Sequence, residues 1–273
     1  MAVPLSQVFF PAAFQELFST WSRLPDAVLC AGGTGFVRAQ EKKEGGPSRP
    51  VISLDRMEEL KKISRTERYL EIGSAVKLSQ LINLGKIVPE AITRCLLLIA
   101  DPQVRNQATI GGNICFPSRK LDASVPMIAL DAQYELRTAQ SSRWVSAARF
   151  SSPAAGELLV RIRVPLEPWT FTWYRKLHNA GGGAILFIMR NEKNILTNIR
   201  IVCGGTVILR DKNSETMLLG KRLPLDRKDA EAFAERWKIY LSGMESAEEH
   251  SQTELTKNQI INFIKTMLRD ISD

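Results

Sequence analysis

The 273-residue chain is long enough to bury one large core or two modest ones, and its 44% of apolar residues exclude a disordered protein. Its formal net charge of +8 does not predict a nucleic-acid partner, because basic and acidic side chains are interleaved, as in residues 56–62. Its longest apolar runs, residues 95–100 and 184–189, are far shorter than the roughly 20 residues of a membrane-spanning helix, so no membrane insertion is expected.

The first segment predicts a helix and a strand that lead into a glycine loop. Apolar side chains at helical spacing predict an amphipathic helix over residues 11–21, and residues 27–30 read as a short buried strand. The strand runs directly into Ala31-Gly32-Gly33-Thr34-Gly35. Adjacent glycines let the backbone adopt φ > 0 and approach a ligand closely, so their N–H groups can converge on phosphate oxygens. An isolated Gly-Gly pair is more often an ordinary turn.

The region that follows predicts an exposed loop and then alternating strands and helices. Residues 41–50 are polar and contain Gly-Gly-Pro, which is typical of an exposed excursion. The spacing of apolar residues predicts the elements that follow this loop. They are strands at residues 51–54 and 69–73, a helix at 78–84 entered through Lys77, a helix at 89–100, and a turn at Asp101-Pro102.

A second glycine segment, Thr109-Ile110-Gly111-Gly112-Asn113, comes after that turn. Gly-Gly again lies beside threonine and a small residue, so the two segments together predict one anion held from two sides. A diphosphate needs many N–H donors of this kind. Thr34 and Thr109 add hydroxyl groups, and Asn113 adds an amide.

The rest of the chain predicts more buried structure, a boundary and a second domain. Residues 158–164 alternate Leu, Val and Ile with Arg, like a strand with one face in water. Pro165 and Pro168 mark a boundary, so we expect domains at residues 1–166 and 167–273. We also expect buried structure at residues 127–136. Strands, or a strand and a helix, are expected at residues 171–177, 184–190 and 199–210, and helices are expected at residues 227–241 and 255–268.

Several common phosphate-binding, catalytic and metal-binding motifs are missing from the sequence. No G-x-G-x-x-G, Walker loop or G-x-S-x-G is present, so phosphates would bind through another architecture. The four cysteines are far apart and only two histidines occur, so we expect no iron–sulfur cluster or other metal site in this chain. Each cysteine is expected to be a small buried apolar residue. Residues 1–5 lack the features of a signal peptide, which favours a cytoplasmic location.

One long block carries a specific resemblance. Residues 101–113, together with Asp122, Pro126 and residues 129–132, closely resemble the flavin-binding subunit of molybdenum hydroxylases, the xanthine dehydrogenase and carbon monoxide dehydrogenase type enzymes. The likeness covers most of the chain, and only roughly the last 40 residues match weakly. It continues through residues 31–34, 72–78, 156–159, 164–165, 174–176, 204–205 and 218–221.

The resemblance implies an α+β fold. Residues 1–166 would form a p-cresol methylhydroxylase-type FAD-binding domain of two subdomains, and residues 167–273 a smaller α+β flavoprotein C-terminal domain, with FAD extended between them. Position by position, Ala31, Gly32, Gly33, Thr34 and Gly35, and Thr109, Ile110, Gly111, Gly112 and Asn113, match the two segments that hold the FAD diphosphate and adjacent atoms.

Two charged residues also match the resemblance. Asp122 matches an acidic residue on the adenosine side of FAD, and Lys176 matches a lysine beside the isoalloxazine. From the residues alone, Asp122 is equally suited to capping a helix or turn, and Lys176 to a solvated strand face. Gly35 and His178 depart from the family pattern, since relatives often carry a polar or acidic residue at the first position and an arginine pair near the second.

The resemblance implies a role in electron transfer. The chain would take electrons from the [2Fe–2S] clusters of a small partner subunit and pass them through FAD to an acceptor such as NAD⁺. A molybdopterin-binding large subunit would oxidise the substrate at its molybdenum cofactor. Because the flavin carries the chemistry, no catalytic dyad or nucleophile is expected here. Two alternatives remain: a self-contained flavin oxidase or reductase, and a degenerate, non-enzymatic flavin-binding module.

Overall fold

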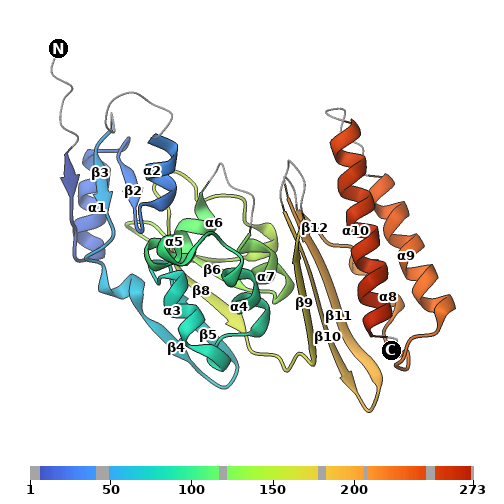
Figure 1. Ribbon diagram of the computed structural model, residues 1–273. Helices are drawn as coiled ribbons and strands as arrows, with labels where there is room; N and C mark the ends of the chain where they lie inside the picture. The colour runs from blue at the N-terminus through green and yellow to red at the C-terminus, as the bar shows by residue number, and fades with distance from the viewer. Residues whose placement is uncertain are drawn as a thin grey trace. The chain divides into compact units, whose positions relative to one another are not determined.

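The chain forms two compact units in a computed structural model that describes residues 7–40, 49–116, 122–177, 183–205, 208–243 and 250–271 (Figure 1). Unit 1 comprises Met1–Arg119 and Leu130–Leu166, and unit 2 comprises Lys120–Ala129 and Glu167–Asp273. Antiparallel sheets with helices packed beside them make the fold α+β, as the sequence predicts. Among the helices of these ranges, none combines the length and apolar character that a membrane span requires.

Unit 1 begins with a small parallel sheet of strand order β1-β3-β2. The predicted helix is confirmed as α1, with Phe14, Leu17 and Phe18 buried. The predicted strand before the first glycine segment is confirmed as β2, although its residues are half-buried instead of buried. The expected excursion falls largely on residues 41–48, outside the described part. The elements are β1 (Val8–Phe9), α1 (Phe14–Arg23), β2 (Val28–Cys30), α2 (Thr34–Gln40) and β3 (Val51–Ser53).

A five-stranded antiparallel sheet of order β4-β5-β8-β6-β7 follows in unit 1. The strands predicted at residues 69–73 and 158–164 are both confirmed in it. Strands β4 and β7 were not expected, because their polar sequences lack an alternating apolar pattern. The strands are β4 (Ile63–Arg65), β5 (Tyr69–Gly73), β6 (Gln133–Arg137), β7 (Ser142–Ser146) and β8 (Leu158–Pro165).

The remaining helices of unit 1 are short, and most of them lie between β5 and β6 in the sequence. The helix expected over residues 89–100 is confirmed as α4, and its apolar face is buried. The turn expected at Asp101-Pro102 is wrong: the Asp101 carboxylate accepts a hydrogen bond from the Val104 N–H at 2.8 Å and so caps a new helix. The helices are η1 (Glu58–Lys61), α3 (Leu78–Asn83), η2 (Gly85–Ile87), α4 (Glu90–Leu97), α5 (Pro102–Gln107), α6 (Ile110–Cys115) and η3 (Ala147–Arg149).

One face of the five-stranded sheet carries a network of charges. The Glu71 carboxylate of β5 accepts hydrogen bonds from Arg161 and Arg163 of β8, each at 2.8 Å. Arg161 also pairs with Glu135 of β6 at 3.2 Å, and the Arg163 guanidinium lies 4.1 Å from the Trp144 ring centroid. Four of the five strands are therefore joined by side chains on the face that the alternating arginines predicted to be wet.

Replacing Glu71 with glutamine is expected to lower the unfolding free energy near pH 7 by about 1–2 kcal/mol, because two arginines lose their shared carboxylate. Burial raises the pKa of Glu71, but hydrogen bonds and charges from Arg161 and Arg163 outweigh that effect and hold the pKa below its usual value. The stability gained is therefore complete above the unfolded-state pKa of about 4.3 and is lost as the pH falls below it.

Urea unfolding of wild type and variant at about pH 7 and about pH 3.5 measures this effect. The free-energy gap between the two proteins should shrink at the lower pH. Glu67→Gln is the matched control, because Glu67 is exposed and has no ion pair in the described part of the chain. Equal losses from both substitutions would show that the network contributes nothing.

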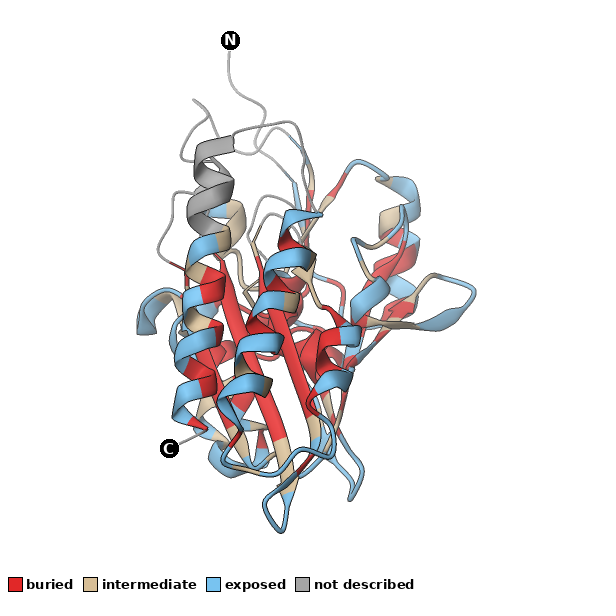
Figure 2. Cartoon of the chain, turned by 90° about the vertical axis from the view of Figure 1, so that its right-hand side faces the viewer, coloured by how far each residue is buried: buried red, intermediate tan, exposed pale blue. Residues whose placement is uncertain are grey.

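Unit 2 is a four-stranded antiparallel sheet of order β12-β11-β10-β9 with two long helices on one face (Figure 2). Residues 171–177 and 184–190, expected to be strands or a strand and a helix, both form strands, and both predicted C-terminal helices are confirmed. The elements are α7 (Ser124–Ala129), β9 (Phe171–Lys176), β10 (Ala184–Glu192), β11 (Ile195–Gly204), β12 (Ile208–Leu209), α8 (Lys212–Met217), α9 (Arg227–Ser242) and α10 (His250–Asp270).

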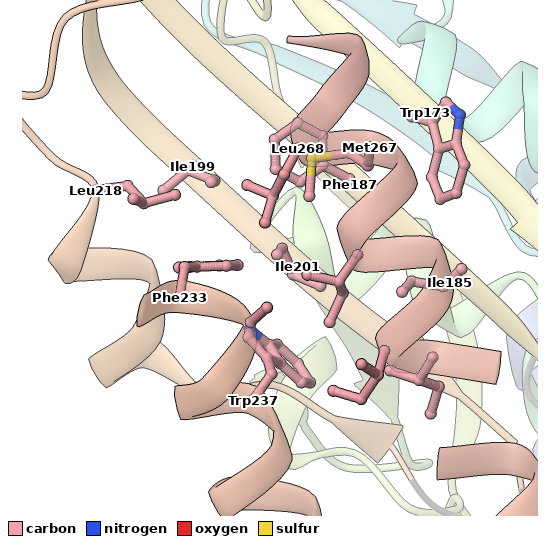
Figure 3. Packing of buried hydrophobic residues seen from close by; sticks show 14 of the residues in the cluster. Trp173, Ile185, Phe187, Ile199, Ile201, Leu218, Phe233, Trp237, Met267 and Leu268 are labelled. Carbon is pink, nitrogen blue, oxygen red and sulfur yellow. The ribbon is translucent and has the colours of Figure 1, made fainter. Parts of the chain in front are cut away.

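The core of unit 2 lies between this sheet and the helices α9 and α10. Ile185 and Phe187 of β10 belong to the same buried cluster as Phe233 and Trp237 of α9 and Met267 of α10 (Figure 3). Residues 184–189 are buried on both faces of the sheet, which explains why they form a continuous apolar run. Burial of each large side chain contributes roughly 1.5–3 kcal/mol, so this cluster is the main stabilising feature of the unit.

Two arginines fix α7 in unit 2. The Arg200 guanidinium of β11 donates to the Ala129 carbonyl at 2.7 Å, and Arg210 donates to the Ile128 carbonyl at 3.2 Å. Both cations thus lie at the C-terminal end of α7, where the helix dipole favours positive charge. By contacts α7 groups with unit 2, although it precedes β6 of unit 1 in sequence. A domain boundary between residues 166 and 167 remains a prediction.

Candidate functional site

The first glycine segment connects the parallel strand β2 to the helix α2. Gly33 has φ +73°, a left-handed conformation that favours glycine, and its carbonyl accepts a hydrogen bond from the Val37 N–H at 2.9 Å. Residues 31–35 are all partly exposed. For the N–H groups of Gly32, Gly33, Thr34 and Gly35, the described part of the chain provides no hydrogen-bond partner. They are available donors at the surface of unit 1.

The first glycine segment lies against residues that flank the second one. A Cβ atom at Gly32 would lie 2.0 Å from the Gln107 carbonyl oxygen and 3.1 Å from the Ala108 Cα, so only glycine allows this approach. A Cβ atom at Gly35 would lie 2.9 Å from two ring atoms of Phe116, at the C-terminal end of α6. The ring covers position 35, which gives a packing reason for the departure seen there in the sequence.

The second glycine segment is the first turn of α6, not a loop. Thr109 is its N-cap, and the Thr109 hydroxyl oxygen accepts a hydrogen bond from the Gly112 N–H at 3.1 Å. The Ile110 N–H donates to the Val76 carbonyl, and the Gly111 N–H donates to the Ser74 carbonyl. The Asn113 N–H donates to the Thr109 carbonyl. The expectation of bare N–H groups in this segment is therefore wrong.

The two glycines of the second segment differ in role. A Cβ atom at Gly111 would lie 2.6 Å from the Ser74 Cβ, so this glycine lets α6 pack against the chain before α3. Thr109 and Ile110 are buried, whereas Gly112 is exposed and Asn113 is partly exposed. Only the Gly112 and Asn113 end of the segment, together with the first segment, presents a surface to a ligand.

Lys77 lies beside the contact between Gly32 and Gln107 and was not predicted as a site residue. Its ammonium donates to the Gln107 carbonyl at 3.1 Å, the same oxygen that lies against Gly32. Thr109 forms an isolated antiparallel bridge with Lys77. The sequence signal was the position of Lys77 within the resembling stretch 72–78, at the entry to a predicted helix, but it suggested only a helix start.

The Cys30 thiol ends β2 beside this contact. Burial raises the pKa of Cys30 above its usual value, although the charge of Lys77 acts in the opposite direction. The thiol is therefore protonated near neutral pH. Its sulfur would lie 3.7 Å from a Cβ atom at Gly33. Cys30 lines the first glycine segment as an uncharged group.

Asp122 and Lys176 form one charge pair in unit 2. The Lys176 Nζ and an Asp122 carboxylate oxygen are 3.8 Å apart, and Asp122 is the more buried of the two. Lys176 ends β9, and Asp122 lies just before α7. The roles that the resemblance implies for these residues lie at opposite ends of FAD, whereas the ion pair puts both groups in one place. His178 lies outside the described residues.

The described residues contain no group of three or more His, Cys, Asp or Glu side chains arranged to hold a metal ion. All four cysteines are free thiols. Cys95 and Cys203 are buried, as expected, but Cys30 and Cys115 are partly exposed. Burial raises the pKa of Cys115 to about 12, so this thiol also stays protonated.

The sequence matches a known family. Residues 4–167 match the family described as FAD binding domain in molybdopterin dehydrogenase, and this range includes both glycine segments. The putative xanthine dehydrogenase FAD-binding subunit XdhB of Escherichia coli (strain K12) is 28% identical over 269 residues, covering 90% of this chain and 88% of the relative. The carbon monoxide dehydrogenase medium chain of Hydrogenophaga pseudoflava is 29% identical over 250 residues, covering 86% and 87%.

Solved structures share the fold over nearly the whole chain. A carbon monoxide dehydrogenase from Hydrogenophaga pseudoflava that lacks the Mo-pyranopterin moiety superposes with a TM-score of 0.81 at 25% identity, covering 100% of this chain and 98% of that chain. Quinoline 2-oxidoreductase from Pseudomonas putida 86 has a TM-score of 0.79 at 21% identity, covering 99% and 96%. The predicted fold class is confirmed.

Proposed function

The chain belongs to the family of FAD binding domains in molybdopterin dehydrogenases, and from this membership we propose that it holds FAD as the flavin subunit of a molybdenum hydroxylase. The relatives it resembles are themselves named as FAD-binding subunits or medium chains. Bound FAD supplies the exchange between one-electron and two-electron carriers, and the residues of this chain bind and orient it.

The close approach of Gly32 to Gln107, two residues before the second glycine segment, is the observation that carries this proposal. A side chain at Gly32 would disrupt this approach, because its Cβ would lie 2.0 Å from the Gln107 carbonyl oxygen. Beside that contact, the N–H groups of Gly32, Gly33, Thr34 and Gly35 have no partner within the described ranges. Phosphate oxygens need such donors, so the residues present fit the diphosphate of a dinucleotide.

We also propose that this subunit relays electrons. They would come singly from the [2Fe–2S] clusters of a small partner subunit and leave to an acceptor such as NAD⁺, in the cytoplasm. A molybdopterin-binding large subunit would oxidise the substrate. The names of the relatives support such an assembly, and the described part of this chain has no metal-binding cluster of its own.

The test is a visible spectrum of the purified chain, followed by anaerobic addition of NADH. We expect a flavin absorption band that NADH bleaches, because the acceptor site works in both directions. A bound flavin that only a reduced iron–sulfur partner bleaches would place the acceptor elsewhere, and one reduced by a small organic substrate would favour a self-contained oxidase. A colourless protein that cannot be reconstituted with FAD would overturn the proposal and leave the non-enzymatic module.

A further inference from the structure

We propose that Lys77 is a direct ligand of the FAD diphosphate, an inference that rests on the proposed function. The glycine segments would otherwise hold a doubly charged anion with uncharged donors alone. The structure adds one ammonium group at the Gln107 carbonyl that Gly32 approaches, and its surroundings suit an anion.

The position of Lys77 is fixed by two contacts. Its backbone forms an antiparallel bridge with Thr109, and its ammonium is 3.1 Å from the Gln107 carbonyl oxygen, which a Cβ atom at Gly32 would approach to 2.0 Å. Its charge also acts on the Cys30 thiol, whose sulfur would lie 3.7 Å from a Cβ atom at Gly33. The Lys77 ammonium and Gly32 therefore share the Gln107 carbonyl oxygen as a neighbour, and Gly32 begins the run of N–H groups that lack partners in the described part of the chain.

The donors and the charge of Lys77 are only partly used. An ammonium has three N–H donors, and the Gln107 carbonyl takes one of them. No carboxylate lies within ion-pair distance of Lys77 among the described residues. A partly buried cation without an acidic partner, next to unpartnered N–H groups, favours binding of a phosphate.

Titration of the full-length apoprotein with FAD, followed by flavin fluorescence, tests the proposal. Lys77→Met keeps the apolar stem and removes the charge, and we expect FAD to bind about 10- to 100-fold more weakly. Lys77→Arg keeps a cation and is expected to bind within about fivefold of wild type. Lys86→Met is the matched control for net charge, because Lys86 is exposed on η2, and it should leave the affinity unchanged.

Competition by inorganic pyrophosphate separates a phosphate ligand from a residue that only holds the backbone. Pyrophosphate should displace FAD from wild type and from Lys86→Met, but at least about tenfold less effectively from Lys77→Met. Weaker FAD binding with unchanged competition would show that Lys77 only positions the Gln107 carbonyl, and equal FAD affinity of Lys77→Met and Lys86→Met would also overturn the proposal. Failure of wild type to bind FAD would instead overturn the proposed function, and the inference with it.

Discussion

Replacing Gly112 with aspartate is expected to abolish FAD retention by the purified chain. Gly112 is the exposed glycine of the second segment, and a Cβ atom there would lie 2.8 Å from the Thr109 hydroxyl oxygen. A carboxylate at this position would add a negative charge to a site that we propose holds a diphosphate. At about 4 Å, and at an effective dielectric constant of about 20, two like charges repel by about 4 kcal/mol, which corresponds to roughly a thousandfold loss of affinity.

The flavin content after purification and the dissociation constant of FAD measure this loss. Gly112→Ala is the matched control, since it introduces the same Cβ contact with Thr109 without a charge. We expect the alanine variant to lose at most about tenfold in affinity, because the threonine hydroxyl needs to shift by only a small distance. Unchanged flavin content in the aspartate variant, with an unchanged melting temperature, would refute the assignment of residues 109–113 to the diphosphate.

The elements that the sequence predicts best are those with a strong local pattern. The helical spacing of Phe14, Leu17 and Phe18 and the apolar run at 184–189 both give the observed elements, because each pattern reflects burial on a defined face. The charged face of the five-stranded sheet follows in the same way from the alternating arginines of β8. Strand β7 has no such pattern, since all five of its residues are exposed or partly exposed.

In the candidate site, the sequence does not predict which groups the glycines contact. The glycine pairs indicate a close approach of the backbone, but they do not say to what. In the structure Gly32 approaches the Gln107 carbonyl, and Gly111 approaches Ser74, so both glycines serve contacts within the chain. Likewise, the N–H groups of the second segment are used because Thr109 caps a helix there. Such partners are distant in sequence, and only the folded chain reveals them.

Charged side chains also form contacts between residues that are far apart in the sequence. Asp122 and Lys176 are more than fifty positions apart, and nothing local predicts their ion pair. Lys77 lies in a recognisable stretch, yet its ammonium reaches a carbonyl thirty residues further along the chain. Charged side chains with long flexible stems can satisfy several roles, so their partners depend on the fold more than on spacing.

Gly32→Ala is expected to push the first glycine segment away from Gln107 and to weaken both folding and FAD binding. The added methyl group would meet the Gln107 carbonyl oxygen at 2.0 Å and its carbon at 2.8 Å. Both are backbone atoms held by α5 and by the Lys77 ammonium, so the chain cannot relieve the overlap by rotating a side chain. Overpacking of this kind costs about 1–3 kcal/mol, which in a chain of this size lowers the melting temperature by roughly 4–10 °C.

Gly35→Ala provides the control for a methyl group added to the same segment. Its Cβ would meet only the ring of Phe116, at 2.9 Å, and an aromatic side chain at a helix end can shift where a backbone carbonyl cannot. We therefore expect the position 35 variant to melt within about 3 °C of wild type and to keep its affinity for FAD, whereas the position 32 variant loses both. If the two variants behaved alike in thermal unfolding and in FAD titration, the approach of Gly32 to Gln107 would not be what holds the segments in place.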